Sequence, residues 1–176
     1  MEYAIVPMLP NHWPAVRGIY GVGMASGYAT FETELPDWEK WDCNHRKDCR
    51  LVALERCEEN SADVPLDQAK VLAWAALSPV STRRVYAGVT EVSIYVAPTA
   101  RARGVGKALL QALVLESEAQ GLWTLQANIF PENAISVRLH ESCGFRKVGV
   151  RSRIGQRGGA WRDVLLLERR SAKVGR

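Results

Sequence analysis

Apolar and polar residues follow two different spacings along the chain. In some stretches they alternate or form short apolar runs, which is typical of β-strands. In others the apolar residues recur every three or four positions, which is typical of α-helices. The strand-like stretches are 2–8, 50–56, 70–78, 91–98, 122–130, 145–154 and 160–169, and the segment 28–35 is also expected to be extended.

Helical spacing predicts four helices, over residues 9–27, 36–49, 104–120 and 131–144. Gly121 follows the third and Gly144 ends the fourth, as expected at helix C-termini. The polar segments 57–69 and 79–90 fit neither spacing and are predicted loops. Helices and strands mix without strict alternation, and no repeat or linker divides the chain. The pattern therefore predicts one α/β domain in which helices flank a central mixed sheet.

Length and composition are those of an ordinary globular domain. The chain has 176 residues, of which 47% are hydrophobic and 24% charged, so a single domain with a full core is expected. No apolar run approaches the roughly 20 residues that a membrane helix needs. The N-terminal stretch MEYAIVPMLP lacks the basic start and apolar core of a signal peptide. A cytoplasmic protein without a membrane partner is therefore expected.

The cysteines do not suggest a metal site. Cys43 and Cys49 enclose His45, but their spacing matches no common zinc motif, and a helix over 36–49 would turn the two thiols to different faces. Cys57 and Cys143 belong to no Cys-x-x-Cys pair. We therefore expect free or buried thiols and no bound metal.

The net charge of +4 does not indicate a nucleic-acid partner. The cations are scattered, except for Arg101, Arg103 and Lys107 and the basic C-terminal end, whose residues 171–176 are expected to form a solvated tail. A nucleic-acid-binding protein would instead carry a basic face with interleaved aromatic residues. A small anionic ligand is the better match.

The stretch RARGVGKALLQAL, residues 101–113, combines a glycine-rich turn with the start of a predicted helix. Leu109 excludes a Rossmann fingerprint, and Ala108 excludes a Walker A loop, because these motifs require glycine and Ser or Thr there. The pattern that fits is Arg-x-x-Gly-x-Gly. Free N–H groups at a helix N-terminus bind anions, and glycines let a bulky anion approach. The turn thus predicts a pyrophosphate site, the alternative being a glycine-rich helix start with basic decoration.

Further motifs give the chain a resemblance to the GNAT N-acetyltransferases. These are EVSIYVAP, NAISVRLHESCGF and the closing stretch GQRGGAWRDVLLLE, with ATFETE near the N-terminus. The last two resemble the phosphinothricin and methionine sulfoximine N-acetyltransferases. The resemblance covers nearly the whole chain. It implies a mostly antiparallel GNAT sheet over residues 1–170, acetyl-CoA as cosubstrate, a small-molecule amine as acceptor and a homodimer.

The resemblance implies two catalytic residues. Glu91 corresponds to the proposed base, and burial in an apolar cleft would raise its pKa. By strand alternation Glu91 shares one face with Ser93 and Tyr95. The alternative is a structural carboxylate at a strand edge. His140 stands where many relatives have a tyrosine acting as general acid, and it can either donate a proton to the departing thiolate or pack on the cosubstrate.

The same resemblance assigns the acetyl-CoA contacts. A backbone N–H near Ile94 is expected to meet the thioester oxygen, and Asn133 is expected to bond the pantetheine amides, to cap its helix, or both. The residues expected to bind acetyl-CoA are Ile94, Tyr95, Val96, Arg101, Ala102, Arg103, Gly104, Val105, Gly106, Lys107, Asn133 and Ser136.

The acceptor is expected to be an amino-acid analogue whose anionic groups pair with arginine. The residues implied for its pocket are Phe31, Glu32, Thr33, Ser81, Thr82, Arg83, Val92, Ser93, Arg157 and Trp161. Acidic residues such as Glu32 and Glu91 keep a polyamine or an aminoglycoside open as acceptor. A protein N-terminus and a non-catalytic acyl-CoA-binding regulatory module are the remaining alternatives.

Overall fold

The computed structural model describes residues 2–56 and 69–175, so Cys57 and nearly all of the predicted loop 57–69 lie outside the described residues. The strands are β1 (Glu2–Pro7), β2 (Arg50–Arg56), β3 (Val71–Pro79), β4 (Val89–Val96), β5 (Thr124–Ile129), β6 (Arg146–Arg157) and β7 (Ala160–Arg170). The helices are α1 (Trp13–Ala25), α2 (Trp38–Asn44), α3 (Val105–Ala119) and α4 (Ala134–Glu141), with short 3-10 turns at Pro10–His12, Arg84–Tyr86 and Pro98–Ala100.

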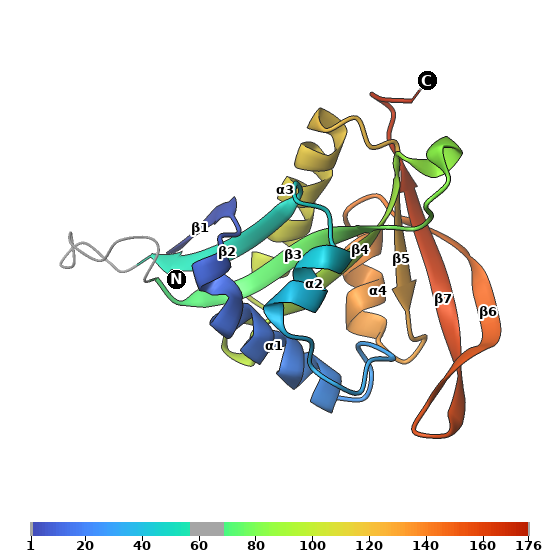
Figure 1. Ribbon diagram of the computed structural model, residues 1–176, viewed down its shortest axis with the longest axis horizontal. Coiled ribbons are helices and arrows are strands. Elements are labelled where there is room, and N and C mark those ends of the chain that lie inside the picture. The colour runs from blue at the N-terminus through green and yellow to red at the C-terminus, as the bar shows by residue number, and fades with distance from the viewer. Residues whose placement is uncertain (1, 57–68, 176) are drawn as a thin grey trace.

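The seven strands found in the described residues join one sheet in the order β1-β2-β3-β4-β5-β7-β6. Every neighbouring pair is antiparallel except β4 and β5, which are parallel. The parallel pair is short, because its register runs only from Val89 opposite Thr124 to Glu91 opposite Gln126. Beyond this point the two strands diverge widely (Figure 1). The predicted mixed, mostly antiparallel sheet is confirmed.

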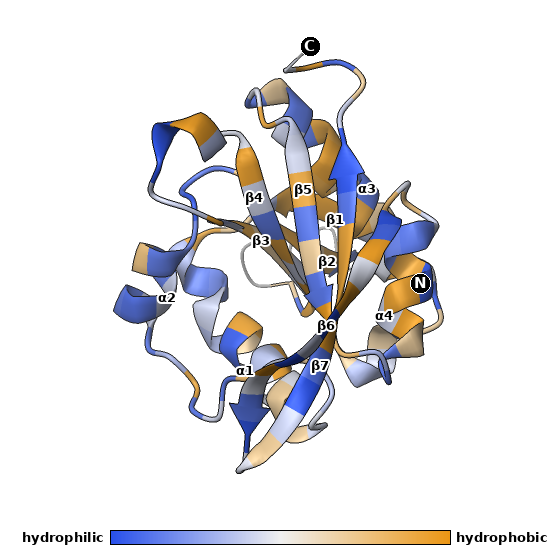
Figure 2. Cartoon of the chain, turned by 90° about the vertical axis from the view of Figure 1, so that its right-hand side faces the viewer, coloured by the Kyte–Doolittle hydropathy of each residue, from blue (hydrophilic) through white to orange (hydrophobic). Residues whose placement is uncertain are grey.

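Helices cover both faces of the sheet (Figure 1). On one face α3 and α4 enclose an aliphatic core that includes Leu72, Leu109, Leu113 and Leu167. On the other face α1 and α2 enclose a smaller core rich in aromatic residues, among them Trp41 and Trp74. The β6–β7 hairpin extends beyond the rest of the sheet (Figure 2).

Helix α3 shows how the local sequence sets the position of an element. Gly104 is its N-cap with a φ of 79°, a left-handed conformation that favours glycine. Gly121, with a φ of 75°, follows the last turn. There the N–H of Leu122 donates to Ser117 O (2.9 Å) and that of Gly121 to Glu118 O (3.1 Å). This is a Schellman termination. Both predicted ends of the helix are therefore confirmed.

The predicted helix over 36–49 is wrong beyond Asn44. Asp37 caps α2 by accepting from the N–H of Lys40 (2.8 Å), so the start was correctly placed. At the other end the Arg50 guanidinium donates to the main-chain oxygens of Asp42 (2.9 Å) and His45 (2.8 Å). These two carbonyl groups therefore accept hydrogen bonds from a side chain and not from the N–H groups of a further helical turn. His45 is accordingly extended, with a ψ of 150°.

The segment 28–35 is irregular and not a strand. The hydroxyl groups of Ser26 and Thr30 accept from the N–H groups of Tyr28 (3.3 Å) and Glu32 (3.1 Å), which are local bonds typical of turns. Strand β4 begins at Val89, two residues earlier than expected, because Val89 and Thr90 already pair with β5. Glu91 therefore lies inside the strand.

The basic C-terminal end packs against α3. Ser171 is buried and donates to Glu118 Oε1 (3.0 Å), and Lys173 pairs with Glu118 Oε2 (3.1 Å). Within residues 2–56 and 69–175 no helix is long and apolar enough to cross a membrane. The same part of the chain contains no cluster of His, Cys, Asp or Glu suited to holding a metal ion.

Candidate active site

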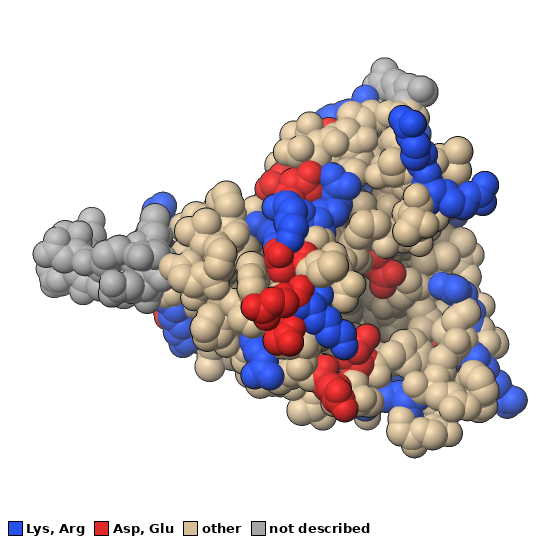
Figure 3. All heavy atoms as spheres, viewed as in Figure 1, with Lys and Arg blue, Asp and Glu red and all other residues tan. Residues whose placement is uncertain are grey.

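A cavity of about 380 Å³ opens on the face of the sheet that carries α1 and α2. Its lining comes from β4 (91–95), the irregular segment after α1 (29–32), α2 and the residue that follows it (Lys40, Trp41, Asn44 and His45), and the end of β5. Figure 3 shows a hollow in this face of the molecule, with acidic atoms on its floor. The volume is that of a pocket for a small molecule.

Glu91 is the carboxylate of β4 that lines this cavity. Burial raises its pKa above the ordinary value, and a hydrogen bond with the Asn128 side chain and the charge of Arg151 partly oppose that rise. The predicted alternation along β4 is confirmed, because Val92, Ile94 and Val96 pack in the α3 core while Tyr95 packs in the α1 core. A carboxyl group with a raised pKa in a cleft is suited to proton transfer.

The divergence of β4 from β5 exposes one edge of the β4 main chain. Pairing with β3 continues along this strand to Val96, whereas pairing with β5 stops at Glu91. Ala97 N–H donates to Leu72 O (2.9 Å) on the β3 side. Since main-chain groups alternate between the two edges of a strand, those of Ile94 and Val96 face the opening. The main-chain groups of Tyr95 face β3, so Ile94 and Val96, and not Tyr95, have main-chain groups directed to bond a ligand there.

The turn 101–107 leads from β4 to the N-terminus of α3. Ala102 and Gly104 both have positive φ, 58° and 79°. Arg101 Nε donates to Val96 O (3.4 Å), which links the turn to the exposed strand edge. A Cβ on Gly106 would come within 3.1 Å of Val96 Cγ2, so glycine lets α3 lie close to β4. Free N–H groups, adjacent cations and close approach are what a pyrophosphate requires.

Helix α4 contributes Asn133 and His140. Asn133 caps the helix by accepting from the N–H of Ser136 (3.2 Å), donates to Tyr28 O (3.2 Å) and lines the cavity. The expected capping role is thus confirmed. His140 is only 2% exposed, lies edge-on to Phe145 and does not line the cavity. Its Nδ1 is 2.8 Å from Ser136 O, and burial lowers its pKa.

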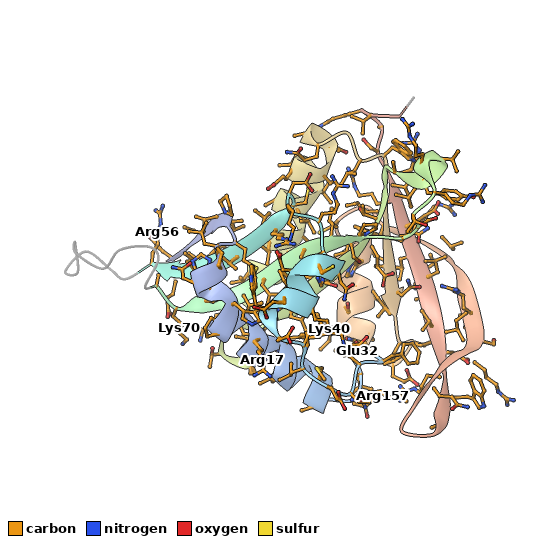
Figure 4. All side chains as sticks on the ribbon, in the orientation of Figure 1. Arg17, Glu32, Lys40, Arg56, Lys70 and Arg157 are labelled. Carbon is orange, nitrogen blue, oxygen red and sulfur yellow. The ribbon has the colours of Figure 1, made fainter. Side chains whose placement is uncertain are left out.

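The expected acceptor-binding residues divide into two groups. Those that line the cavity are Phe31, Glu32, Val92 and Ser93. Those that do not are Thr33, Ser81, Thr82, Arg83, Arg157 and Trp161. Arg157 donates from Nη2 to Met24 O (2.8 Å) and so ties the β6–β7 hairpin to α1, and Trp161 is 57% exposed. In Figure 4, Glu32 and Lys40, which both line the cavity, lie below α2, and Arg157 lies lower in the view, toward the β6–β7 hairpin.

Several lining residues were not predicted. Asn128 was detectable, because on β5 it shares with Gln126 the polar side of an alternating strand. His45 was hidden by the overlong helix predicted over 36–49, whereas Lys40 lies on the part of that helix that is correct, where nothing in the sequence pattern marked it as a cavity residue. Tyr20 packs in the core between α1 and the sheet, with its ring centroid 4.9 Å from that of Tyr95 in an edge contact, and it also reaches the cavity.

Comparison with known proteins agrees with this geometry. The sequence model of the acetyltransferase (GNAT) family matches residues 22–145, more than half of the chain. A phosphinothricin N-acetyltransferase of Streptomyces coelicolor is 36% identical over 173 residues, 96% of each chain. An L-methionine sulfoximine/L-methionine sulfone acetyltransferase of Pseudomonas aeruginosa is 35% identical over 99 residues, which span 56% of this chain and 58% of that protein.

A solved structure extends the likeness to the whole fold. The crystal structure of a phosphinothricin acetyltransferase from Sinorhizobium meliloti in complex with acetyl-CoA matches with a TM-score of 0.83 at 26% identity. The match covers 99% of this chain and 91% of that one. The resemblance inferred from the sequence motifs is confirmed. This chain therefore belongs to the acetyltransferase (GNAT) family, as an N-acetyltransferase whose cosubstrate is acetyl-CoA.

Proposed function

We propose that the chain acetylates the amino group of a small amino-acid analogue of the phosphinothricin or methionine sulfoximine type. The observation that carries the proposal is the position of Glu91, a carboxylate of raised pKa in a small cavity at the point where β4 leaves β5. The cavity volume suits such an acceptor. The names of the relatives from Streptomyces coelicolor and Pseudomonas aeruginosa point to the same class.

In this proposal Glu91 acts as the base of a direct transfer. Its carboxylate accepts a proton from the substrate ammonium, directly or through one water, and the neutral nitrogen attacks the thioester carbonyl carbon. The N–H of Ile94 donates to the carbonyl oxygen as negative charge develops on it. A C–N bond forms, the C–S bond breaks, and the thiolate of the departing coenzyme A takes up the proton that the attacking nitrogen loses, directly or through water, while the proton held by Glu91 returns to solvent. The turn 101–107 holds the pyrophosphate at the N-terminus of α3.

We propose that His140 does not act as the general acid. A carbonyl oxygen only accepts, so the bond to Ser136 O requires the proton of His140 to sit on Nδ1. Burial lowers the pKa of the imidazole, which keeps it neutral. Nε2 then carries a lone pair and no proton to give. In this account His140 supports α4 through its contact with Phe145.

The charges of the cavity favour a zwitterionic acceptor. Lys40 supplies a cation for the substrate carboxylate, while Glu32 and Glu91 supply carboxylates for the substrate ammonium group. A polyamine has no carboxylate to pair with Lys40. An amino-acid analogue satisfies both signs of charge.

An acceptor panel tests this selectivity. Thiol release from acetyl-CoA is measured with phosphinothricin, methionine sulfoximine, methionine sulfone, spermidine, kanamycin and a short peptide with a free N-terminus. The proposal expects saturable turnover with the first three and the highest kcat/KM among them. A higher kcat/KM for spermidine, kanamycin or the peptide would reassign the acceptor class.

We also propose a homodimer formed through the β6–β7 side of the sheet. Strand β6 is an edge strand, and the large apolar side chains exposed on the hairpin are Val148, Val150, Ile154 and Trp161. An exposed apolar edge of this kind is typical of an interface. A second chain would cover Trp161 and bring this hairpin close to an acceptor site.

Trp161→Glu is expected to convert the dimer into a monomer, because it places a charge within the apolar patch. Sedimentation velocity at micromolar concentration measures the change. Val85→Glu is the matched control, since Val85 is 66% exposed on the separate turn Arg84–Tyr86 and should leave the dimer intact. A monomeric wild-type protein, or a dimeric Trp161→Glu variant, would contradict the proposal.

A further inference from the structure

His45 lines the cavity but has no part in the chemistry proposed above. It is the first residue after α2, and its ring stacks on the indole of Trp41 with centroids 4.2 Å apart and planes inclined by 21°. Its Nδ1 is 2.7 Å from Trp41 O. Stacking and hydrogen bond together fix the orientation of the imidazole.

The hydrogen bond also fixes the tautomer. Trp41 O can only accept, so the proton of a neutral His45 must sit on Nδ1. The second nitrogen, Nε2, is then a hydrogen-bond acceptor. It makes no hydrogen bond to any residue in 2–56 or 69–175. The opposite tautomer would set the Nδ1 lone pair against the carbonyl oxygen.

The surroundings of His45 disfavour the imidazolium form. Burial has the largest effect and lowers the pKa of His45, and the charge of Arg50 lowers it further. The hydrogen bond to Trp41 O and the charge of Asp42 raise the pKa and partly offset this decrease. The same Arg50 holds this segment in place, donating to His45 O (2.8 Å) and to Asp42 Oδ1 (2.5 Å). His45 therefore lines the cavity as a neutral imidazole whose orientation is fixed by Trp41.

We propose that His45 Nε2 accepts a hydrogen bond from an N–H group on the acceptor substrate and thereby selects analogues that carry such a donor. This inference rests on the proposed function. Among the proposed acceptors, a sulfoximine carries an N–H group on sulfur. A sulfone of the same shape carries only oxygens, whose lone pairs would face the lone pair of Nε2. A site that holds one fixed acceptor discriminates against the analogue that lacks the donor.

The test compares kcat/KM for methionine sulfoximine and methionine sulfone. The wild type is expected to favour the sulfoximine by about tenfold, the scale of one hydrogen bond left unpaired in a partly buried site. His45→Phe keeps a ring to stack on Trp41 but removes the acceptor, so this ratio should fall to about one, through a higher KM for the sulfoximine with kcat changed by less than about threefold. His45→Gln restores an acceptor near the position of Nε2 and should recover the KM for the sulfoximine.

Cys43→Ser is the matched control, because Cys43 is exposed on α2 and does not line the cavity, and it should leave the ratio unchanged. Thermal melts show that each variant is folded. A wild-type ratio of one, or a His45→Phe variant that keeps the wild-type preference, overturns the role of His45. Absence of turnover with either acceptor overturns the proposed function and this inference with it. Independently, long-range proton–nitrogen NMR spectra should show the Nδ1–H tautomer of His45, and the Nε2–H tautomer would overturn the inference.

Discussion

Gly104→Glu is expected to abolish acetyl-CoA binding in calorimetric titration while the protein stays folded. A glutamate there would place a negative charge and a side chain at the N-terminus of α3, where the pyrophosphate is proposed to bind. No atom of the described residues beyond its chain neighbours lies within 4 Å of where a Cβ at this position would sit. The new side chain therefore meets no steric obstacle there. The free energy of unfolding should fall by about 1–3 kcal/mol, because a residue other than glycine must adopt the positive φ of 79°.

Gly121→Glu is the matched control for this variant. Gly121 also has a positive φ, 75°, and lies just after the opposite end of α3. A Cβ at this position would likewise meet open space within 4 Å among the described residues. Both variants should show a similar decrease in the free energy of unfolding, but only Gly104→Glu should lose its affinity for acetyl-CoA. Equal affinities in the two variants would show that the turn 101–107 is not the pyrophosphate site.

Glu91→Gln is expected to lower kcat by about 10²- to 10⁴-fold, the usual contribution of a positioned base. The amide keeps the shape of the side chain and its hydrogen bonding to Asn128 but cannot accept a proton. Glu34→Gln is the control, because Glu34 is exposed, follows the cavity segment 29–32 closely in the chain and does not line the cavity. Wild-type kcat in Glu91→Gln would remove Glu91 from the mechanism.

The raised pKa of Glu91 also sets two pH effects. In the wild type, kcat/KM should fall on acidification through a pKa above the ordinary glutamate value. This decrease should be missing from the residual activity of Glu91→Gln.

The raised pKa of Glu91 also affects the free energy of unfolding, which should depend on pH in the direction opposite to that expected for a salt-bridged carboxylate. The native state binds the Glu91 proton more tightly than the unfolded chain does, so stability falls as pH rises through the two pKa values. Glu91→Gln should therefore melt at the same or a higher temperature than the wild type at neutral pH.

The parts of the site that depend on local sequence were predictable. The glycines at 104 and 121 set both ends of α3, and strand alternation predicted the side of β4 that carries Glu91. The Asn133 cap followed from the preference of asparagine for that position. In each case the residues that determine the conformation lie within a few positions of it, so a sequence pattern is sufficient.

The parts that depend on distant residues were not predictable. Helix α2 ends early because Arg50, on the next strand, donates to the carbonyls of Asp42 and His45. That bonding brings His45 to the cavity. Asn128 comes close to Glu91 only because β4 and β5 pair in parallel at this point. Arg157 was expected at the acceptor pocket, but its guanidinium bonds to Met24 O across the fold. The spacing of residue types along the chain does not indicate contacts between residues that are far apart in the sequence.

The most direct test of the account is thiol release from acetyl-CoA by the purified protein with methionine sulfoximine, followed by mass spectrometry of the amine and repeated with Glu91→Gln. The account predicts saturable release, one acetyl group on the α-amino nitrogen for each thiol released, and loss of both in the variant. If the wild type binds acetyl-CoA but acetylates neither methionine sulfoximine nor phosphinothricin, or if Glu91→Gln is as active as the wild type, the account is contradicted.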